Sequence, residues 1–321
     1  MWKQFVAERE DQPGPAWLAR FRAGREEAER WYRGRGPADR PTAAECRTAL
    51  RRHMPELLPH YDRVCALVGD DELAHRILSQ YRPAPVAHGC SQAIWLGGDG
   101  PALVRNYDYP LDIVSDRFEL TAWSGRRVIG KAQRPWGGLL DGMNEDGLVA
   151  SLAHGGGRAQ GLGFSIILML RCVLETCSRV AEAVEMLKTI PVAQSQNVVL
   201  LDRTGGHAIL FLGPDRVPAV SEALACTNHQ EEALARSGSV VRQQALLDGL
   251  AAPGASLADL VRRFLEPPVH VRQGGAATVY SAVYRPAAGR VDYIWPGKIW
   301  GQSFARFEEG AYRHDYGEAQ G

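Results

Sequence analysis

The chain has 321 residues, 45% of them hydrophobic, so it can bury a substantial core as one large domain or as one domain with a smaller appendage. Its 37 basic and 37 acidic side chains cancel, and this balance argues against the phosphate-binding surface of a nucleic-acid-binding protein. The N-terminus has no apolar signal segment, and even the longest apolar runs, such as residues 166–170, are much too short to cross a bilayer. We therefore expect a cytoplasmic protein that binds neither nucleic acid nor membrane.

The six cysteines do not form a disulfide framework in a chain of this length, and no two of them are spaced C-x2-C. The histidines likewise show no spacing typical of metal ligands. We expect reduced thiols, no metal site and no cofactor.

Residues 1–82 are predicted to be helical. Apolar side chains recur on one helix face in three stretches, around Phe21, Leu50 and Ile77. Pro83 and Pro85 end this part, because proline lacks the amide donor and disfavours helix in the residue before it. We interpret residues 1–89 as a helical prosegment or cap.

Strand patterns begin after residue 91. Short strands are predicted over residues 93–96, 101–106, 119–123, 127–132, 139–143, 148–153, 197–201, 207–212, 278–284 and 291–295. Helix pairs are predicted over residues 164–177 and 180–188, then 243–250 and 257–264. Strand blocks separated by helix pairs favour an α+β domain of two sheets between helical layers, over residues 90–321.

The boundary between the helical part and the strand-rich part has the sequence His88-Gly89-Cys90-Ser91. An ordinary thiol has a pKa of about 8.5 and needs a base to become a thiolate. If the Gly89–Cys90 bond were cleaved, the new α-amino group, with a pKa of roughly 7.7–8.0, would lie within reach of its own sulfur. Gly89 suits such cleavage because glycine tolerates a strained backbone. The alternative is that Cys90 is a small buried hydrophobic residue.

Arg105 and Asp108 follow Cys90 by one strand, a turn and a returning strand, so they are expected beside it. A carboxylate there would orient an α-ammonium group, and a guanidinium would hold a thiolate or a substrate carboxylate. The alternative is a surface ion pair, which is common and weak.

Asn228 and His229 end a short apolar strand. The Asn228 amide could donate to an oxyanion without carrying charge, and His229 could instead pair with Cys90 as a general base. The alternative for both is an ordinary turn.

A glycine run, His154-Gly155-Gly156-Gly157, matches the oxyanion loop of some α/β-hydrolase esterases. That fold requires a G-x-S-x-G elbow, which occurs nowhere in the chain. We expect a flexible loop that admits or shapes a substrate.

Four motifs together resemble a known family. They are Gly89-Cys90-Ser91, Arg105-Asn106-x-Asp108, Gly142-Met143-Asn144-Glu145-x-Gly147-Leu148 and Thr227-Asn228-His229. Their order and spacing resemble the acyl-coenzyme A:6-aminopenicillanate acyltransferases, N-terminal-nucleophile (Ntn) hydrolases related to choloylglycine hydrolases and penicillin V amidases. The resemblance implies a four-layer αββα fold, autocatalytic cleavage between Gly89 and Cys90, and a heterodimer of prosegment 1–89 with catalytic domain 90–321.

The resemblance also implies roles for site residues. Cys90 would be the nucleophile and its α-amino group the base. Asp108 and Arg105 would orient that amine and contact the substrate, Asn228 would form the oxyanion hole, and Arg242 would lie near the nucleophile.

Three further residues are candidates for substrate or oxyanion contacts: His154, His229 and Asn144. His154 stands about where the bile-salt branch has an asparagine, which leaves the second oxyanion contact and any bile-salt-like specificity open. The expected substrate is a small acyl-amide or acyl-CoA thioester, whose acyl group passes to water or to an amine. A non-catalytic binding protein or unprocessed precursor on the same fold is the alternative, and homo-oligomerisation is left open.

Overall fold

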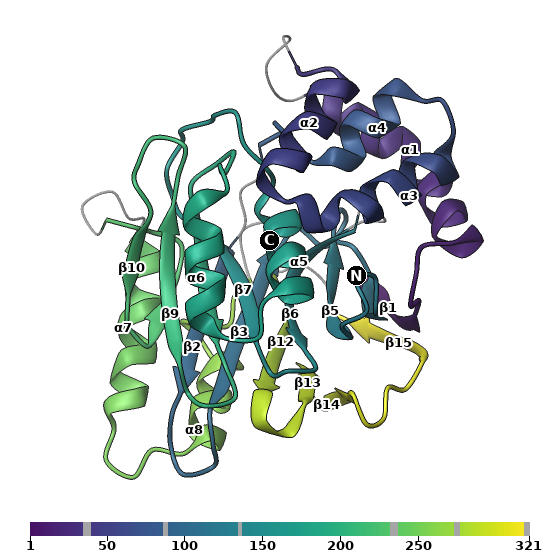
Figure 1. Ribbon diagram of the computed structural model, residues 1–321. Coiled ribbons are helices and arrows are strands. Elements are labelled where there is room, and N and C mark those ends of the chain that lie inside the picture. Colours follow the sequence, from purple (N-terminus) through teal and green to yellow (C-terminus); the bar gives the residue numbers. More distant parts are fainter. Residues whose placement is uncertain (35–39, 86–88, 134–136, 232–236, 273–276, 318–321) are drawn as a thin grey trace.

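A computed structural model describes residues 1–34, 40–85, 89–133, 137–231, 237–272 and 277–317 of the chain. It contains two β-sheets with helices packed on them (Figure 1). The strands of the larger sheet, in the order β10-β9-β8-β7-β6-β5-β4-β1-β15, are β1 (Trp2–Arg9), β4 (Arg117–Thr121), β5 (Val128–Gln133), β6 (Gly138–Asn144), β7 (Val149–His154), β8 (Gln196–Leu201), β9 (His207–Leu212), β10 (Ala219–Ser221) and β15 (Gly310–Asp315). Those of the smaller sheet, in the order β11-β2-β3-β12-β13-β14, are β2 (Gly89–Trp95), β3 (Ala102–Tyr109), β11 (Ala225–Cys226), β12 (Ala277–Arg285), β13 (Arg290–Trp295) and β14 (Lys298–Ser303).

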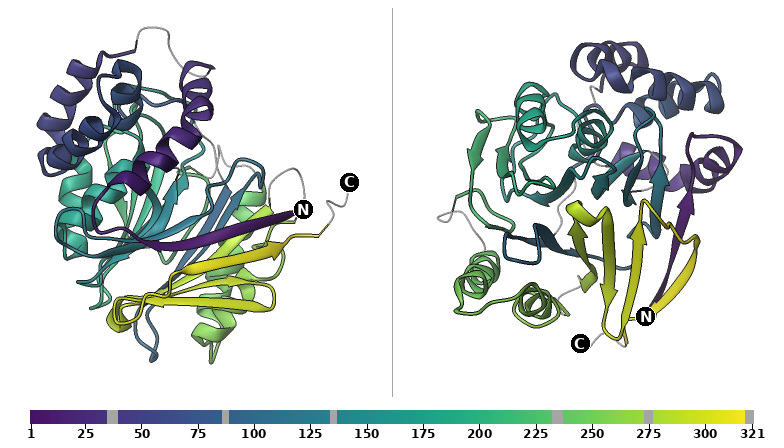
Figure 2. Two further views of the ribbon diagram at one scale, coloured as in Figure 1. Left: turned by 90° about the vertical axis from the view of Figure 1, so that its right-hand side faces the viewer. Right: turned by 60° about the horizontal axis from the view of Figure 1, so that its bottom comes forward.

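The helices fall into three groups. The N-terminal group consists of α1 (Pro15–Gly34), α2 (Ala43–His53), α3 (Leu58–Val68) and α4 (Glu72–Ser79), with a short 3₁₀ turn, η1 (Pro55–Leu57). The second group, α5 (Ile166–Thr176) and α6 (Val180–Thr189), contacts β6 to β9 of the larger sheet, and the third, α7 (Ser237–Ala251) and α8 (Leu257–Phe264), contacts β2, β3 and β11 of the smaller one. Figures 1 and 2 show α1–α4 gathered at one end of the molecule, next to α5. None of the helices in the described part of the chain has both the length and the apolar character needed to cross a bilayer.

Strand alternation sends the side chains of the smaller sheet to two different cores. Ala93, Trp95 and Val104 pack with apolar residues of α7 and α8. Cys90 and Ile94, which point the opposite way, join the main core with the larger sheet and α5. The Cys90 sulfur is therefore directed toward the space between the sheets.

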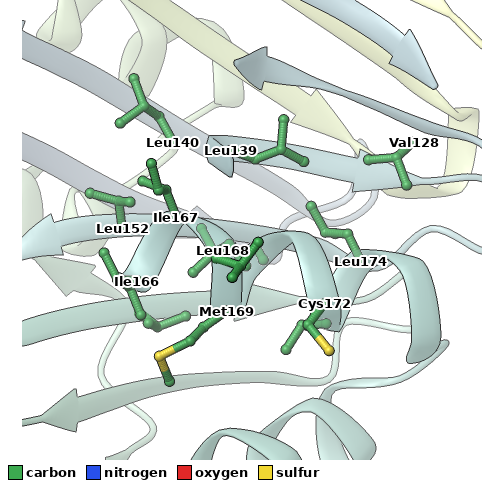
Figure 3. Close-up of a cluster of buried hydrophobic side chains, with 14 of the residues drawn as sticks. Val128, Leu139, Leu140, Leu152, Ile166, Ile167, Leu168, Met169, Cys172 and Leu174 are labelled. Atoms are coloured by element: carbon green, nitrogen blue, oxygen red, sulfur yellow. The ribbon is translucent and has the colours of Figure 1, made fainter. Parts of the chain in front are cut away.

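Helix α5 is buried from Ile166 to Glu175, as its nearly continuous apolar sequence predicts. It contacts strands β6 and β7, helix α6 and the turn η1. Figure 3 shows its apolar side chains packed with Leu139, Leu140 and Leu152 of the two strands. A Cβ at Gly138 would lie 2.5 Å from Ile167 Cγ1, so glycine permits this close approach.

All the strands and helices predicted between residues 93 and 295 are present, with ends shifted by a few residues. The N-terminal prediction is wrong for residues 2–9, which form strand β1 rather than helix. There Phe5 and Ala7 are buried while the residues between and around them are more exposed, a period of two that fits a strand. Strand β1 pairs in parallel with β4 and antiparallel with β15, so the start of the N-terminal segment is built into the larger sheet.

Candidate active site

Cys90 is the second residue of β2, and its side chain is fully buried. The antiparallel register with β3 places Cys90 opposite Tyr107, Gly89 opposite Asp108 and Gln92 opposite Arg105. The predicted return of Arg105 and Asp108 to the start of the Cys90 strand is thus confirmed. In this continuous chain the Cys90 nitrogen is a backbone amide.

Arg105 lies on the sulfur side of Cys90. Its Nη2 donates to Cys90 Sγ at 3.2 Å, and its Nη1 donates to Asp141 Oδ2 at 2.6 Å and to the Leu140 carbonyl at 3.0 Å. Because Asp141 belongs to β6, this guanidinium joins the two sheets directly beneath the thiol. Burial raises the pKa of the Cys90 thiol to about 11, although the charge of Arg105 acts to lower that pKa.

Asp141 was not anticipated from the sequence. It receives hydrogen bonds from the hydroxyl groups of Tyr280 and Tyr284 as well as from Arg105, and all four side chains are fully buried. The signal available was a charged residue inside the apolar strand predicted over residues 139–143. A buried carboxylate needs partners of this kind.

Asp108 points to the opposite face of β3, toward α7. Its Oδ2 accepts from Arg242 Nη1 at 2.9 Å and its Oδ1 accepts from the Thr278 hydroxyl at 2.7 Å. Burial raises the pKa of this carboxyl group, while Arg242 and the Thr278 hydrogen bond act to lower it. Successive side chains of a strand point to opposite faces, so Arg105 lies beside the Cys90 sulfur and Asp108 lies on the opposite face of the sheet from that sulfur.

The φ angle of Gly89 is not positive, so a left-handed backbone is not what requires glycine here. The structure gives another reason for glycine. A Cβ at this position would lie 2.9 Å from Asp108 Cβ, which is closer than real Cβ contacts. Gly89 is needed to bring the two strands together at the predicted cleavage site.

Asn228 contacts the Cys90 nitrogen. Its Oδ1 accepts from the Cys90 amide at 2.9 Å and from Arg242 Nη2 at 2.8 Å, while its Nδ2 donates to the His154 carbonyl at 3.3 Å. Arg242 also donates to the Ser91 hydroxyl at 3.2 Å. The Arg242 guanidinium, from α7, therefore binds Asp108, Ser91 and Asn228, which surround the start of β2.

Ser239, near the start of α7, holds the backbone of Asn228. Its hydroxyl accepts from the Asn228 amide at 2.8 Å, donates to Thr227 Oγ1 at 3.0 Å, and lies 2.9 Å from His229 Nδ1. Because α7 supplies both Ser239 and Arg242, it fixes Asn228 at its backbone and at its side chain.

The histidine candidates are placed differently from Asn228. His229 Nδ1 faces the hydroxyl groups of Thr227 and Ser239, and within the described residues its ring makes no hydrogen bond to the Cys90 thiol. The alternative Cys90–His229 pair is therefore not seen. His154 contributes its carbonyl to Asn228, while its Nδ1 accepts from the Gly156 amide and so holds the glycine run that follows.

Asn144 lies outside this cluster, which corrects its assignment to the site. Its Nδ2 donates to the carbonyl groups of Leu174 and Cys177, and its Oδ1 accepts from the Leu148 amide. It thus connects the β6–β7 turn to the end of α5, a structural role.

All six cysteines are free thiols. Within the ranges that the structure describes, no three His, Cys, Asp or Glu side chains are grouped so that they could hold a metal ion. The groups gathered at Cys90 are a thiol, a cation at its sulfur, and an amide oxygen at its nitrogen. This set is suited to acyl transfer through sulfur.

Comparison with known proteins gives a family and a fold. The family model for acyl-coenzyme A:6-aminopenicillanic acid acyl-transferase matches residues 95–300, which include Arg105, Asp108, Asn228 and Arg242 and begin just after Cys90. No protein in a search of the curated proteins matches the chain.

Among solved structures, a mutant conjugated bile acid hydrolase from Clostridium perfringens is similar, with a TM-score of 0.51 and 13% identity over 71% of this chain and 97% of that one. An N-acylethanolamine-hydrolyzing acid amidase ortholog from Caenorhabditis elegans gives a TM-score of 0.48 and 16% identity over 62% and 93% of the two chains. Penicillin V acylase from Agrobacterium tumefaciens gives 0.46 and 14% over 72% and 93%. The first of these likenesses shows that the chain shares the fold of the bile acid hydrolase.

Proposed function

Because the chain belongs to the acyl-coenzyme A:6-aminopenicillanic acid acyl-transferase family, we propose that it is an Ntn cysteine amidohydrolase or acyltransferase that activates itself by cleavage before Cys90. One observation carries the proposal. The nitrogen of Cys90 donates to Asn228 Oδ1, and the sulfur of the same residue accepts from Arg105 Nη2. Each of the two atoms needed by an N-terminal nucleophile has its own partner before cleavage.

The proposed cleavage begins with attack of Cys90 Sγ on the Gly89 carbonyl carbon. A C–S bond forms, the C–N bond to Cys90 breaks, and the thiol proton passes to the departing nitrogen. Water then hydrolyses the thioester, which leaves a carboxylate on Gly89 and a free α-amino group on Cys90. Asn228 Oδ1 and the nearby Asp108 carboxylate would orient that amine.

Turnover follows with a substrate acyl-amide or acyl-CoA thioester. The α-amino group of Cys90 takes the thiol proton, and the thiolate attacks the substrate carbonyl. Asn228 Nδ2, whose 3.3 Å bond to His154 is long, is the side-chain donor for the oxyanion. The leaving amine or thiol takes the proton, and water or an acceptor amine then releases the acyl group from sulfur.

We place this chemistry in a four-layer αββα sandwich. The outer layers would be α5 with α6 and α7 with α8, which contact the larger and the smaller sheet respectively. The cleaved N-terminal piece would stay bound as the partner in a heterodimer, since β1 is hydrogen-bonded within the larger sheet. The free state of all six cysteines supports a cytoplasmic location.

Intact-mass measurement of purified protein tests the maturation step. The wild type should give two fragments, the heavier one beginning at Cys90, and the Cys90→Ala chain should remain whole. Cys172→Ala is the matched control, because Cys172 is also buried but lies on α5, and it should cleave like the wild type. A wild-type chain that is active without being cleaved would refute the proposal.

A second candidate is a non-catalytic or permanently unprocessed protein on the same fold. The high pKa of the buried Cys90 thiol in the continuous chain supports it. Iodoacetamide labelling at neutral pH separates the two candidates. Labelling of Cys90 no faster than that of Cys172, in protein that stays whole, would favour the second.

A further inference from the structure

Asn228 lies in a turn whose backbone is held by two elements far apart in the sequence. Asn197 of β8 donates through Nδ2 to the carbonyl groups of Thr227 and His229, at 2.9 Å and 3.0 Å. Ser239 of α7 accepts from the Asn228 amide through its hydroxyl oxygen. Because that amide is already engaged, Asn228 can serve an oxyanion through its side-chain Nδ2 rather than through its backbone.

The contacts around Ser239 allow the hydroxyl protons to be assigned. The Thr227 hydroxyl donates to the Ser239 carbonyl at 2.9 Å, because a carbonyl oxygen can only accept. This uses the one hydroxyl proton of Thr227, so Thr227 Oγ1 accepts from the Ser239 hydroxyl, 3.0 Å away. That bond in turn uses the one hydroxyl proton of Ser239. Any further hydrogen bond to Ser239 Oγ must therefore come from a donor.

His229 Nδ1 makes the further contact. It lies 2.9 Å from Ser239 Oγ and 3.2 Å from Thr227 Oγ1. If Nδ1 carries a proton, it donates to Ser239 and both hydroxyl protons keep their acceptors. If Nδ1 is unprotonated, the Ser239 proton must turn to it, and the two hydroxyl oxygens then face each other with no proton between them. All three side chains are buried, where such a mispaired contact is unfavourable.

We propose that His229 is a positioning residue of the oxyanion hole, held with its proton on Nδ1, and that it acts on Asn228 through the hydroxyl group of Ser239. Donation from Nδ1 fixes the orientation of that hydroxyl, so that an oxygen lone pair faces the Asn228 amide. This role differs from that of a general base for Cys90. The positioning role rests on the proposed function; the protonation of Nδ1 does not.

15N NMR of the imidazole rings measures the protonation directly. The sample is the full-length Cys90→Ala chain labelled at its histidines, and the His229 signals are assigned by their loss when His229→Asn is added. Nδ1 should carry a proton throughout the range from about pH 6 to 9, because the neutral Nδ1-protonated ring and the imidazolium both have it. An unprotonated Nδ1 in this range would overturn the proposal.

Two substitutions at position 229 test the role in catalysis. Asparagine Nδ2, like histidine Nδ1, is bonded to Cγ, whereas the glutamine amide lies one atom further out, as histidine Nε2 does. His229→Asn should therefore be about tenfold more active per cleaved chain than His229→Gln, the effect of one hydrogen bond. The difference should appear equally in kcat and kcat/KM, because an oxyanion hole acts in the transition state. Equal rates for the two variants would overturn the positioning role.

A double variant tests whether His229 acts through Ser239. Ser239→Ala removes the acceptor, so in that background His229→Asn and His229→Gln should be equally active. A difference that persists without the Ser239 hydroxyl would refute this route.

His207→Gln is the matched control. His207 on β9 also makes a hydrogen bond through Nδ1, but to the Gly205 carbonyl. This variant should keep the wild-type kcat. A tenfold loss here would show that the effect is not specific to position 229, and would overturn the assignment.

The two measurements separate this proposal from the proposed function. A protonated Nδ1 in a chain that never cleaves would keep the hydrogen-bond assignment and refute the enzyme. Cleavage and turnover in a protein whose His229 Nδ1 is unprotonated would keep the enzyme and refute the positioning role.

Discussion

The guanidinium of Arg105 donates to the Cys90 sulfur at 3.2 Å, and both side chains are fully buried. A neighbouring cation favours a thiolate, but burial opposes it more strongly, and the thiol pKa is raised to about 11. The uncleaved chain therefore holds the Cys90 side chain in place as a neutral thiol. In the proposed mechanism this thiol needs a base, and the amine released by cleavage would be that base.

Thiol alkylation should show this difference. With a pKa of about 11, only about one Cys90 thiol in ten thousand is ionised at pH 7, so the uncleaved chain should label slowly, and faster as the pH rises toward 11. Cleaved protein should label quickly near neutral pH because the amine takes the proton. Iodoacetamide rates from pH 6 to 10, read by mass on each species, check this. Equal pH profiles for the two species would contradict it.

Arg105 and Asp141 form a fully buried ion pair that joins the two sheets. Removing one partner leaves the other charge buried without compensation, so Arg105→Met should lower the free energy of unfolding by about 3–5 kcal/mol. Asp141→Asn removes the charge that Arg105→Met leaves unpaired. The double variant should therefore lose less free energy of unfolding than the two single variants lose together. Urea denaturation of the four proteins measures this coupling. Strict additivity would show that the pair does not act as a unit.

The sequence was most informative where the contacts are local. Arg105 and Asp108 follow Cys90 by one hairpin, and a hairpin fixes its own register, so their return to Cys90 could be predicted. Strands β1 and β15 could not be paired in this way, because Phe5 and its partner Tyr312 are separated by nearly the whole chain.

Contacts between side chains of elements far apart in the sequence could not be predicted from the sequence either. Asp141 is bonded to Tyr280 and Tyr284 across about 140 residues, and no local pattern encodes that contact. Arg242 was placed near the nucleophile only through a family resemblance. Its hydrogen bonds to Asp108 and Asn228 depend on how α7 packs on β2 and β11.

Arg242 should set the pH dependence of the mature protein. Its Nη2 and the Cys90 nitrogen share one acceptor, Asn228 Oδ1, so after cleavage the guanidinium lies close to the new amine. A neighbouring positive charge disfavours protonation of an amine and keeps more of it as free base. Removing that charge should raise the amine pKa. The acid limb of kcat/KM in Arg242→Gln should therefore move to higher pH, by about one unit.

Three comparisons make the Arg242 experiment specific. Arg242→Lys keeps the charge and should keep the acid limb near its wild-type position. Arg262→Gln, at an exposed position on α8, should change nothing. Rates are normalised to the cleaved fraction by titrating reactive thiols, because the substitution can also slow maturation. An unshifted acid limb in Arg242→Gln would show that this arginine only positions Asn228.

Strand β1 should keep the N-terminal piece bound after cleavage. Phe5 is fully buried against Phe118 and Trp295, with ring centroids 5.8 Å and 5.0 Å apart, and β1 is hydrogen-bonded on both edges. The two fragments should therefore elute together in gel filtration and separate only in denaturant. Phe5→Ala should lower the free energy of unfolding by about 3–5 kcal/mol, and Val6→Ala, on the less buried face, by much less. Fragments that separate in native buffer would show that the N-terminal segment is a removable propeptide.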